Sequence, residues 1–157
     1  MIKKVMFTSS PIGELCLAEK DGKICDIAPK ERRARKDFIL EKTPLLLEAE
    51  KQLSQYFKGE RKKFDLPLLL EGTPFQIKIW QNLIKIPYGQ TVSYAELAEN
   101  AGSKKAARAA GNANNKNPIL IVVPCHRVIG ADGKLSGFAC GTDKKKFLLA
   151  LELYFKD

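Results

Sequence analysis

The sequence predicts an α+β fold in which a small α/β unit is followed by a mainly helical unit. Alternating apolar residues on both sides of an Asp-Gly turn near the start of the chain indicate a β-hairpin. From residue 73 onward, helix-capping residues alternate with apolar residues at helical spacing. Since 157 residues suit one or two small domains, we expect a structural domain at 1–68 and a second domain at 69–157.

The N-terminal hairpin is expected to join residues 14–18 to residues 24–27. Cys16 and Cys25 fall within these strands, and we interpret them as packing residues rather than as a disulfide. A helix should follow, marked by its first residue, its apolar residues and its terminal glycine: Pro44, Leu45, Leu46, Ala49, Leu53, Tyr56, Phe57 and Gly59. No residue of this half carries recognisable chemistry.

The chain is strongly basic, with 27 Lys and Arg residues, 18 Asp and Glu residues and a formal net charge of +9. A protein with this charge attracts polyanions, so nucleic acid or another acidic surface is the first partner to consider. We interpret the basic run at 30–36 as a solvated loop, with a second DNA contact as the alternative.

Several classes of protein do not fit this sequence. The longest stretch without a polar side chain, 118–125, is far shorter than the ~20 residues that span a bilayer, and the N-terminus lacks a secretion signal. Four cysteines without a CxxC pair and a single histidine do not supply a closed zinc site. We therefore expect no membrane association, no metal and reduced thiols in an intracellular compartment.

A capping box marks the first helix of the C-terminal half. Thr73 can cap this helix, Pro74 suits its first position, and Gln76 completes the box. Four apolar residues should line one face of the helix: Ile79, Trp80, Leu83 and Ile84.

A second capping box, formed by Ser93 and Glu96, should start a short helix that turns Leu97 and Ala98 inward. This helix is expected to stop at 101–103, and a third helix should run over 104–114. Two short helices joined by a three-residue turn that contains glycine are typical of a helix-turn-helix.

Small and basic side chains dominate the third helix. Its Ala and Gly residues allow another surface to approach the backbone closely, and Lys104, Lys105 and Arg108 supply positive charge. An Ala-rich surface helix is the alternative, because helix propensity alone allows it. The turn and the net charge favour DNA contact, although neither specifies the groove.

Cys125 follows the apolar run at 119–123, which should be buried, and precedes the only histidine, His126, and then Arg127. The thiolate is the reactive form of cysteine, and a nearby cation lowers the pKa of a thiol from about 8.5. Because neighbouring side chains point in different directions, a water or a sharp turn would have to link the sulfur to the imidazole. An inert packing cysteine is the alternative.

The last helix carries a stripe that includes a carboxylate. Thr142 is expected to cap this helix. The stripe consists of Lys145, Leu148, Leu149, Glu152 and Phe155. Glu152 is either an exposed carboxylate at the rim or the group that orients His126 in a nucleophile–base–orienter array. The preceding loop at 136–141 is rich in glycine, so its backbone can approach a flat ligand.

Together, the C-terminal motifs resemble those of the O6-alkylguanine-DNA alkyltransferases, also called methylated-DNA–protein-cysteine methyltransferases. The resemblance covers about residues 72–155 and includes the active-site signature PCHRV, preceded by NP and an Ile/Val run. The other matching motifs are TPFQ…W, PYGQTVSYAELA, RAAGNANNKNP and KxxLLxxE. The first half fits loosely, as the variable RNase H-like N-terminal domain of this family does.

The resemblance implies direct and irreversible reversal of DNA damage, without a cofactor. An O6-alkylguanine, or an O4-alkylthymine, in double-stranded DNA would be flipped into a pocket and would transfer its alkyl group to the sulfur of Cys125. His126, through a water, would act as the base, and Glu152 would hold its imidazole. Because a thioether has no hydrolysable bond, each protein molecule would react once.

The resemblance also assigns supporting roles. Tyr94 would donate a proton to the leaving purine and help to rotate the nucleotide, and Arg108 would fill the vacated stack from a helix in the minor groove. Asn117 would brace the turn that carries the nucleophile, and Lys145 would polarise the O6 side. The implied DNA contacts are Tyr94, Lys104, Lys105, Ala107, Arg108, Gly111 and Asn112. The implied substrate pocket contains Val128, whose backbone would read the base edge, with Phe138, Ala139 and Cys140.

Departures from the family pattern affect the pocket. Many relatives have Tyr at the position of Phe138 and Gly at the position of Cys140, whose side chain would narrow the space for bulky adducts. Two rival interpretations stay open: a helix-turn-helix regulator whose Cys125 senses oxidants or alkylating agents, and a Cys-His-Glu hydrolase. We expect a monomer, and leave open whether it binds cooperatively along DNA.

Overall fold

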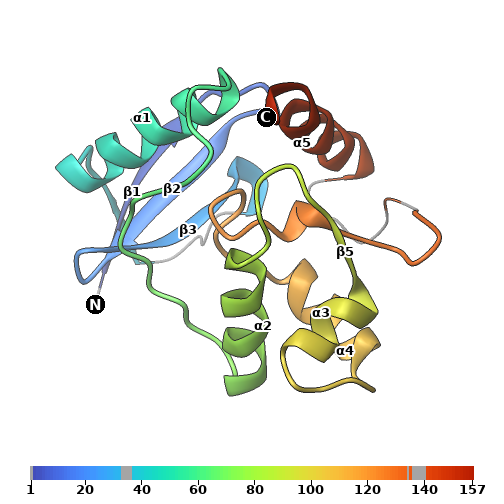
Figure 1. The fold of residues 1–157 in the computed structure, drawn as a ribbon. Coiled ribbons are helices and arrows are strands. Elements are labelled where there is room, and N and C mark those ends of the chain that lie inside the picture. Colours follow the sequence, from blue (N-terminus) through green and yellow to red (C-terminus); the bar gives the residue numbers. More distant parts are fainter. Residues whose placement is uncertain (1, 33–36, 134, 136–140) are drawn as a thin grey trace. The chain divides into compact units, whose positions relative to one another are not determined.

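The computed structural model describes residues 2–32, 37–133, 135 and 141–157. The chain divides into two compact units (Figure 1). The first unit contains Met1–Leu70 and Pro118–Leu120, and the second contains Glu71–Asn117 and Ile121–Asp157. Strands dominate the first unit and helices the second, so the predicted α+β class is confirmed.

The first unit is built on a four-stranded sheet with the order β3-β2-β1-β4. Strands β1 (Lys3–Thr8), β2 (Leu15–Lys20) and β3 (Lys23–Pro29) are antiparallel, and β4 (Phe38–Leu40) is parallel to β1. The predicted hairpin is the β2–β3 pair. Asp21 and Gly22 both have positive φ, 55° and 73°, as a type I′ turn requires.

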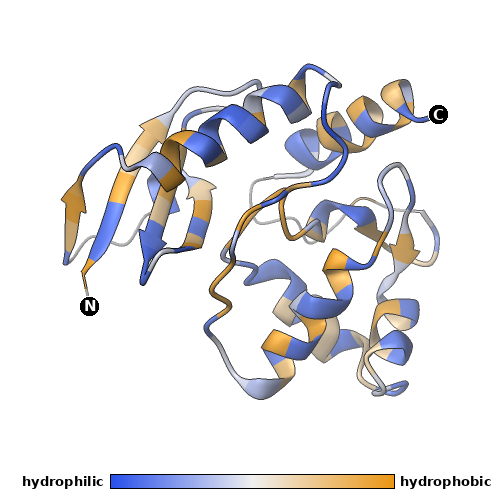
Figure 2. Cartoon of the chain, turned by 60° about the vertical axis from the view of Figure 1, so that its left-hand side comes forward, coloured by the Kyte–Doolittle hydropathy of each residue, from blue (hydrophilic) through white to orange (hydrophobic). Residues whose placement is uncertain are grey.

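Helix α1 (Pro44–Phe57) packs on this sheet and alternates polar with apolar stretches along its length (Figure 2). It begins as predicted, and the Leu46 backbone N–H donates to the Thr43 side chain that caps it. Cys16 and Cys25 lie in one buried apolar cluster and, within the described residues, are not joined in a disulfide, which confirms their interpretation as packing residues. In the basic run, 30–32 form the short helix η1 (Lys30–Arg32), while 33–36 lie outside the described residues.

The outer edge of β3 is occupied by two short segments from distant parts of the chain. Leu68 forms a parallel bridge with Ile24, and Ile119 forms one with Ile27. The Ile27 N–H donates to the Pro118 carbonyl at 2.9 Å, and the Leu120 N–H donates to the Ile27 carbonyl at 2.9 Å. The segment that leads toward Cys125 is therefore hydrogen-bonded to the sheet.

Helix α2 (Pro74–Ile84) starts the second unit with the predicted capping box between Thr73 and Gln76. It buries Ile79, Trp80 and Leu83 as expected. The prediction for Ile84 is wrong, since its side chain is 44% exposed. The helix ends at this residue, and the buried apolar position after Leu83 belongs to Ile86 in the following turn.

Helices α3 (Tyr94–Asn100) and α4 (Ala107–Asn115) pack against each other and form the predicted helix pair. The capping box of Ser93 and Glu96 is present, and Leu97 and Ala98 are buried. The predicted start of α4 is wrong, because the connection runs over 101–106 rather than 101–103. Gly102 adopts positive φ, and the Ala106 N–H donates to the Ser103 carbonyl at 2.8 Å, which extends the turn.

The remaining elements carry or flank the cysteine motif. Strands β5 (Val92–Ser93) and β6 (Val128–Ile129) form a parallel pair, the short helix η2 covers Cys125–Arg127, and α5 covers Thr142–Phe155. The prediction that Thr142 caps α5 is wrong. The cap residue is Gly141, and Thr142 is already the first helical residue. In the described parts of the chain, we find no helix with the length and apolar character needed to cross a membrane.

Candidate functional site

The backbone turns sharply at Pro124, directly before Cys125. Pro124 has φ −81° and ψ 67°, the geometry of an inverse γ-turn, and the Cys125 N–H donates to the Val123 carbonyl at 2.8 Å. The Arg127 N–H then donates to the Pro124 carbonyl at 3.0 Å, which closes η2. Cys125 is only 2% exposed. We call residues 123–127 the nucleophile turn.

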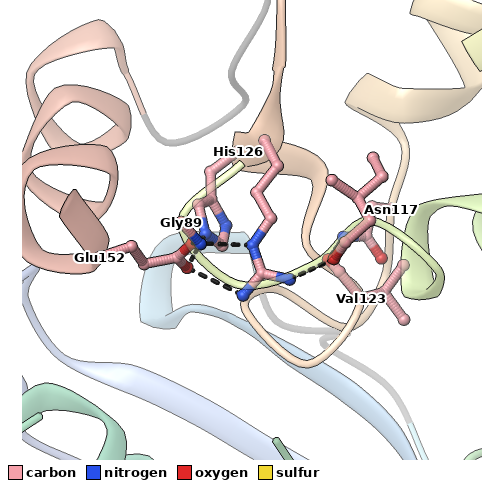
Figure 3. Close-up of polar contacts among 7 residues, drawn as sticks. Gly89, Asn117, Val123, His126 and Glu152 are labelled. Atoms are coloured by element: carbon pink, nitrogen blue, oxygen red, sulfur yellow. Dashed lines mark hydrogen bonds and ion pairs between the residues drawn. The ribbon is translucent and has the colours of Figure 1, made fainter. Parts of the chain in front are cut away.

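Two buried asparagines donate hydrogen bonds to backbone carbonyls of this turn. Asn117 Nδ2 donates to the Val123 carbonyl at 2.6 Å (Figure 3), and Asn114 Nδ2 donates to the Cys125 carbonyl at 3.3 Å. The position of Asn117 agrees with the expected bracing of the turn. Asn114 was not among the predicted site residues, because the sequence does not show which face of α4 meets Cys125.

His126 and Glu152 form a short, buried contact. His126 Nε2 lies 2.6 Å from Glu152 Oε2, and the two side chains are 0% and 1% exposed (Figure 3). The alternative of an exposed carboxylate is therefore wrong. Glu152 reaches the imidazole from α5, which is the geometry expected of a group that orients the histidine.

Glu152 also accepts hydrogen bonds from three other donors. Arg127 donates from Nε to Oε1 at 2.8 Å and from Nη2 to Oε2 at 3.0 Å, and the Gly89 N–H donates to Oε1 at 3.0 Å (Figure 3). Arg127 Nη1 donates to the Ile86 carbonyl at 2.7 Å. The Arg127 guanidinium thus donates hydrogen bonds both to the Glu152 carboxylate and to the backbone of the 86–89 turn. Sequence reasoning missed Ile86 and Gly89 because they contribute backbone groups, which carry no side-chain signal.

These contacts set the charges of the buried pair. Burial alone would raise the pKa of Glu152, but hydrogen bonds and charges from His126 and Arg127 outweigh it and hold that pKa far below its usual range. Burial lowers the pKa of His126, and the opposing effect of Glu152 does not compensate for it. At neutral pH the site therefore contains a carboxylate and a neutral imidazole that can accept a proton.

Stability should fall as the pH is lowered from neutral. Unfolded His126 and Glu152 take up protons near their ordinary pKa values, about 6.5 and 4.3, whereas both pKa values are lower in the folded protein. The unfolded state therefore binds more protons, and stability is lost first below about pH 6.5 and then further below about pH 4.3. Urea unfolding at pH 7.5, 6 and 5 measures this. A His126→Asn variant should lose less between pH 7.5 and 5, and an equal loss would contradict the assignment.

Tyr94 and Lys145 approach the same region from α3 and α5. Lys145 is fully buried, and its Nζ lies 5.9 Å from the centre of the Tyr94 ring. The ring also packs on α4, since a Cβ added at Gly111 would lie 3.4 Å from Tyr94 Cδ1. Burial lowers the pKa of Lys145, and the charge of a Cys125 thiolate opposes this effect. The ammonium group and the sulfur are therefore electrostatically coupled.

The β5–β6 pair connects the nucleophile turn to the start of α3. Val128 pairs with Val92, and Ile129 pairs with Ser93, the residue before Tyr94. The Val128 N–H also donates to the Cys125 carbonyl. The pairing brings the backbone of Val128 beside the strand that leads into Tyr94.

The predicted DNA contacts on and before α4 differ in exposure. Arg108 and Asn112 are exposed on α4, Ala107 and Gly111 are half-buried, and Ala110, Ala113 and Asn114 form the buried face. Lys104 and Lys105 are exposed, but they lie in the turn before α4 rather than on the helix. Three predicted pocket residues, Phe138, Ala139 and Cys140, lie outside the described residues.

Among residues 2–32, 37–133, 135 and 141–157, no three His, Cys, Asp or Glu side chains are placed to hold a metal ion.

Fold and site define a protein with a small sheet unit and a helical unit. The helical unit combines a helix-turn-helix pair with a buried cysteine that directly precedes a buried His–Glu pair in the sequence. Residues 74–154 match the family model described as 6-O-methylguanine DNA methyltransferase, DNA binding domain. Residues 3–70 match 6-O-methylguanine DNA methyltransferase, ribonuclease-like domain. The chain belongs to the 6-O-methylguanine DNA methyltransferase family, which confirms the predicted resemblance.

Individual relatives are similar over nearly the whole chain. The methylated-DNA–protein-cysteine methyltransferase of Methanosarcina acetivorans is 50% identical over 146 residues, which cover 91% of this chain and 94% of the relative. The constitutive enzyme of that name from Bacillus subtilis is 46% identical over 150 residues, 91% of each chain. The crystal structure of Mycobacterium tuberculosis OGT in complex with DNA has a TM-score of 0.90 and 43% identity, and covers 99% of this chain and 94% of that one.

Proposed function

We propose that this protein repairs alkylated DNA by transferring an alkyl group from O6-alkylguanine, or from O4-alkylthymine, to the sulfur of Cys125, once per protein molecule. The observation that carries this proposal is the nucleophile turn itself. Its Cys125 is followed by His126, which is held against Glu152, in a chain of the 6-O-methylguanine DNA methyltransferase family. Relatives named for cysteine methyl transfer from DNA, and one solved in complex with DNA, support it.

In the proposed reaction, the S–C bond forms as the bond between the alkyl carbon and O6 breaks. The thiol proton passes through a water to His126, whose imidazole is neutral at neutral pH. Glu152 then stabilises the imidazolium. The electron pair left on the purine is neutralised by a proton from Tyr94, with Lys145 polarising the O6 side, so unmodified guanine is released.

The thioether on Cys125 cannot be hydrolysed, so the protein is consumed in the reaction. No step requires an oxidant, a reductant or a group donor other than the lesion. Asn117 would keep the nucleophile turn in place through the Val123 carbonyl. The backbone of Val128, with Phe138, Ala139 and Cys140, would form the pocket for the base.

DNA would be contacted through the exposed side of α4 and the lysines before it. A base inside a duplex is unreachable to Cys125, so the lesion has to be extruded at a cost of a few kcal/mol. Arg108, exposed near the start of α4, would fill the vacated stack. The net charge of +9 favours association with the phosphate backbone. We expect the protein to act as a monomer where the DNA lies, in the cytoplasm with the nucleoid or in a nucleus.

Incubation with a duplex that contains one O6-methylguanine tests the proposal. Intact-mass measurement should show one added CH2 unit per protein, peptide mapping should place it on Cys125, and the DNA should contain unmodified guanine. Several turnovers per protein would instead indicate a hydrolase. Lesion binding without transfer would indicate a helix-turn-helix regulator with a sensing cysteine.

Replacing Arg108 with Ala should slow repair of a duplex substrate by about 10- to 100-fold, because stabilisation of the extruded state is lost. Reaction with a free O6-alkylguanine nucleoside, which needs no extrusion, should stay within about twofold. Single-turnover rates on both substrates measure the difference. Arg61→Ala, which removes the same charge from the first unit, is the matched control and should leave both rates unchanged. Equal slowing on the two substrates would contradict the role of Arg108.

A further inference from the structure

Asn114 connects the helix proposed to contact DNA with the residue proposed to react. It lies on the buried face of α4, whereas Arg108 and Asn112 are exposed on the same helix. Asn114 is 1% exposed, and its Nδ2 donates to the Cys125 carbonyl at 3.3 Å. The helix that would meet the duplex therefore holds a hydrogen bond to the backbone of the nucleophile.

The amide oxygen of Asn114, unlike its amide nitrogen, has no hydrogen-bond partner among the described residues. Within the described residues, Asn114 Oδ1 is buried and accepts no hydrogen bond. A buried polar atom without a hydrogen-bond partner destabilises the fold, so an apolar side chain would be more favourable at this position if only packing were needed. The hydrogen bond from Asn114 Nδ2 to the Cys125 carbonyl therefore explains why a polar residue stands at this position. This hydrogen bond is long, as catalytic hydrogen bonds often are before the substrate complex forms.

The neighbouring Asn117 acts at a different point. It donates to the Val123 carbonyl from the segment after α4, across the loop that contains both residues. A shift of α4 would therefore reach Cys125 directly through Asn114. Helix α4 is also hydrogen-bonded to α2, since Trp80 Nε1 donates to the Ala113 carbonyl at 2.8 Å. Consecutive residues of α4 thus connect it to α2 and to the nucleophile turn.

We propose that Asn114 is a positioning residue that transmits the DNA-loaded position of α4 to Cys125. The inference rests on the proposed function. When the duplex binds the exposed side of α4, the Asn114 hydrogen bond tightens and holds the Cys125 carbonyl, and with it the sulfur, in line with the alkyl carbon. Since a misplacement of about 1 Å can cost roughly 100-fold in rate, a single hydrogen bond at this point is sufficient for a measurable effect.

An Asn114→Leu variant tests this proposal, because Leu has a similar size and lacks the donor. Transfer from an O6-methylguanine duplex should slow by about tenfold or more, while transfer from the free O6-methylguanine nucleoside and the duplex Kd should stay within about twofold. Asn82→Leu is the matched control. It removes another Asn hydrogen bond to a backbone carbonyl in the same unit, Asn82 Nδ2 to Lys78, and should leave both rates unchanged.

Comparing the duplex with the free nucleoside distinguishes a positioning role of Asn114 from a purely structural role. An equal fall with duplex and nucleoside would show a structural role only and would overturn the inference, as would unchanged rates on both. If Asn114→Leu does not fold, Asn114→Ala carries the same comparison, with nucleoside transfer as the measure of folded protein. If the wild-type protein transfers from neither substrate, the proposed function itself fails, and the positioning role falls with it.

Discussion

Replacing Cys125 with Ser should abolish alkyl transfer while lesion-containing DNA is still bound. A serine hydroxyl is not ionised near neutral pH and is a far weaker nucleophile than a thiolate, so the rate should fall by at least roughly 1,000-fold. Oxygen is smaller than sulfur, and the backbone hydrogen bonds of the turn, to Val123 and from Asn114, do not involve the replaced atom. Intact-mass measurement for transfer and a fluorescence titration for binding test the two halves of this expectation.

Cys25→Ser is the matched control for this substitution. Cys25 is also buried, but it lies in β3 of the first unit, where its Sγ donates to Asp26 Oδ2 at 3.6 Å, a hydrogen bond that a hydroxyl can also make. The variant should transfer as the wild type does. Persistent transfer by Cys125→Ser would show that Cys125 is not the nucleophile. Loss of transfer in Cys25→Ser as well would show that the effect of replacing a buried cysteine is not specific to Cys125.

Local sequence signals were sufficient wherever the relevant contacts are local. The capping boxes at Thr73 and Ser93 and the turn at Asp21 were predicted correctly, because each depends on residues at most three positions apart. The start of α4 was not, because the Gly102 turn continues through hydrogen bonds that leave no clear residue preference. Two lysines expected on a helix therefore lie in the turn before it.

Non-local backbone contacts explain what the sequence could not show of the site. One of the two interpretations of Glu152 placed its carboxylate against His126, and the structure shows this contact. The donors from Gly89 and Arg127 to the same carboxylate depend on how 86–89 and α5 approach each other in space. Backbone groups are present at every residue, so no sequence pattern identifies the one that will be used.

Ile121 is a further case in which the tertiary structure overrides local preference. It is a buried β-branched residue with φ +71°, a conformation that such residues rarely adopt and that costs on the order of 1–3 kcal/mol. It lies between Pro118–Leu120, which is hydrogen-bonded to β3, and the nucleophile turn. The hydrogen bond from Leu120 to Ile27 before it and the hydrogen bond from Asn117 to Val123 after it hold the backbone of Ile121 in this unfavourable conformation.

Replacing Glu152 with Gln should have the largest effect on stability. The neutral side chain leaves the buried Arg127 guanidinium without its anion, and loss of one partner of a buried ion pair costs about 3–5 kcal/mol. The amide Nε2 would also face donors from Arg127 and Gly89, where the carboxylate now accepts on both oxygens. We therefore expect the free energy of unfolding to fall by about 3–5 kcal/mol, measured by urea unfolding at pH 7.5.

The same variant should slow transfer in a pH-dependent way. Glu152 now opposes the effect of burial on the imidazole, so its loss lowers the pKa of His126 further and makes the base weaker. Single-turnover rates at pH 6 to 8.5, under conditions where the variant is folded, should fall by about 10-fold or more, with recovery toward high pH as the thiol ionises unaided. Glu99→Gln, exposed on α3, should change stability by less than about 0.5 kcal/mol. A Glu152→Gln protein as stable and as fast as this control would show that the buried carboxylate neither holds the turn nor serves the base.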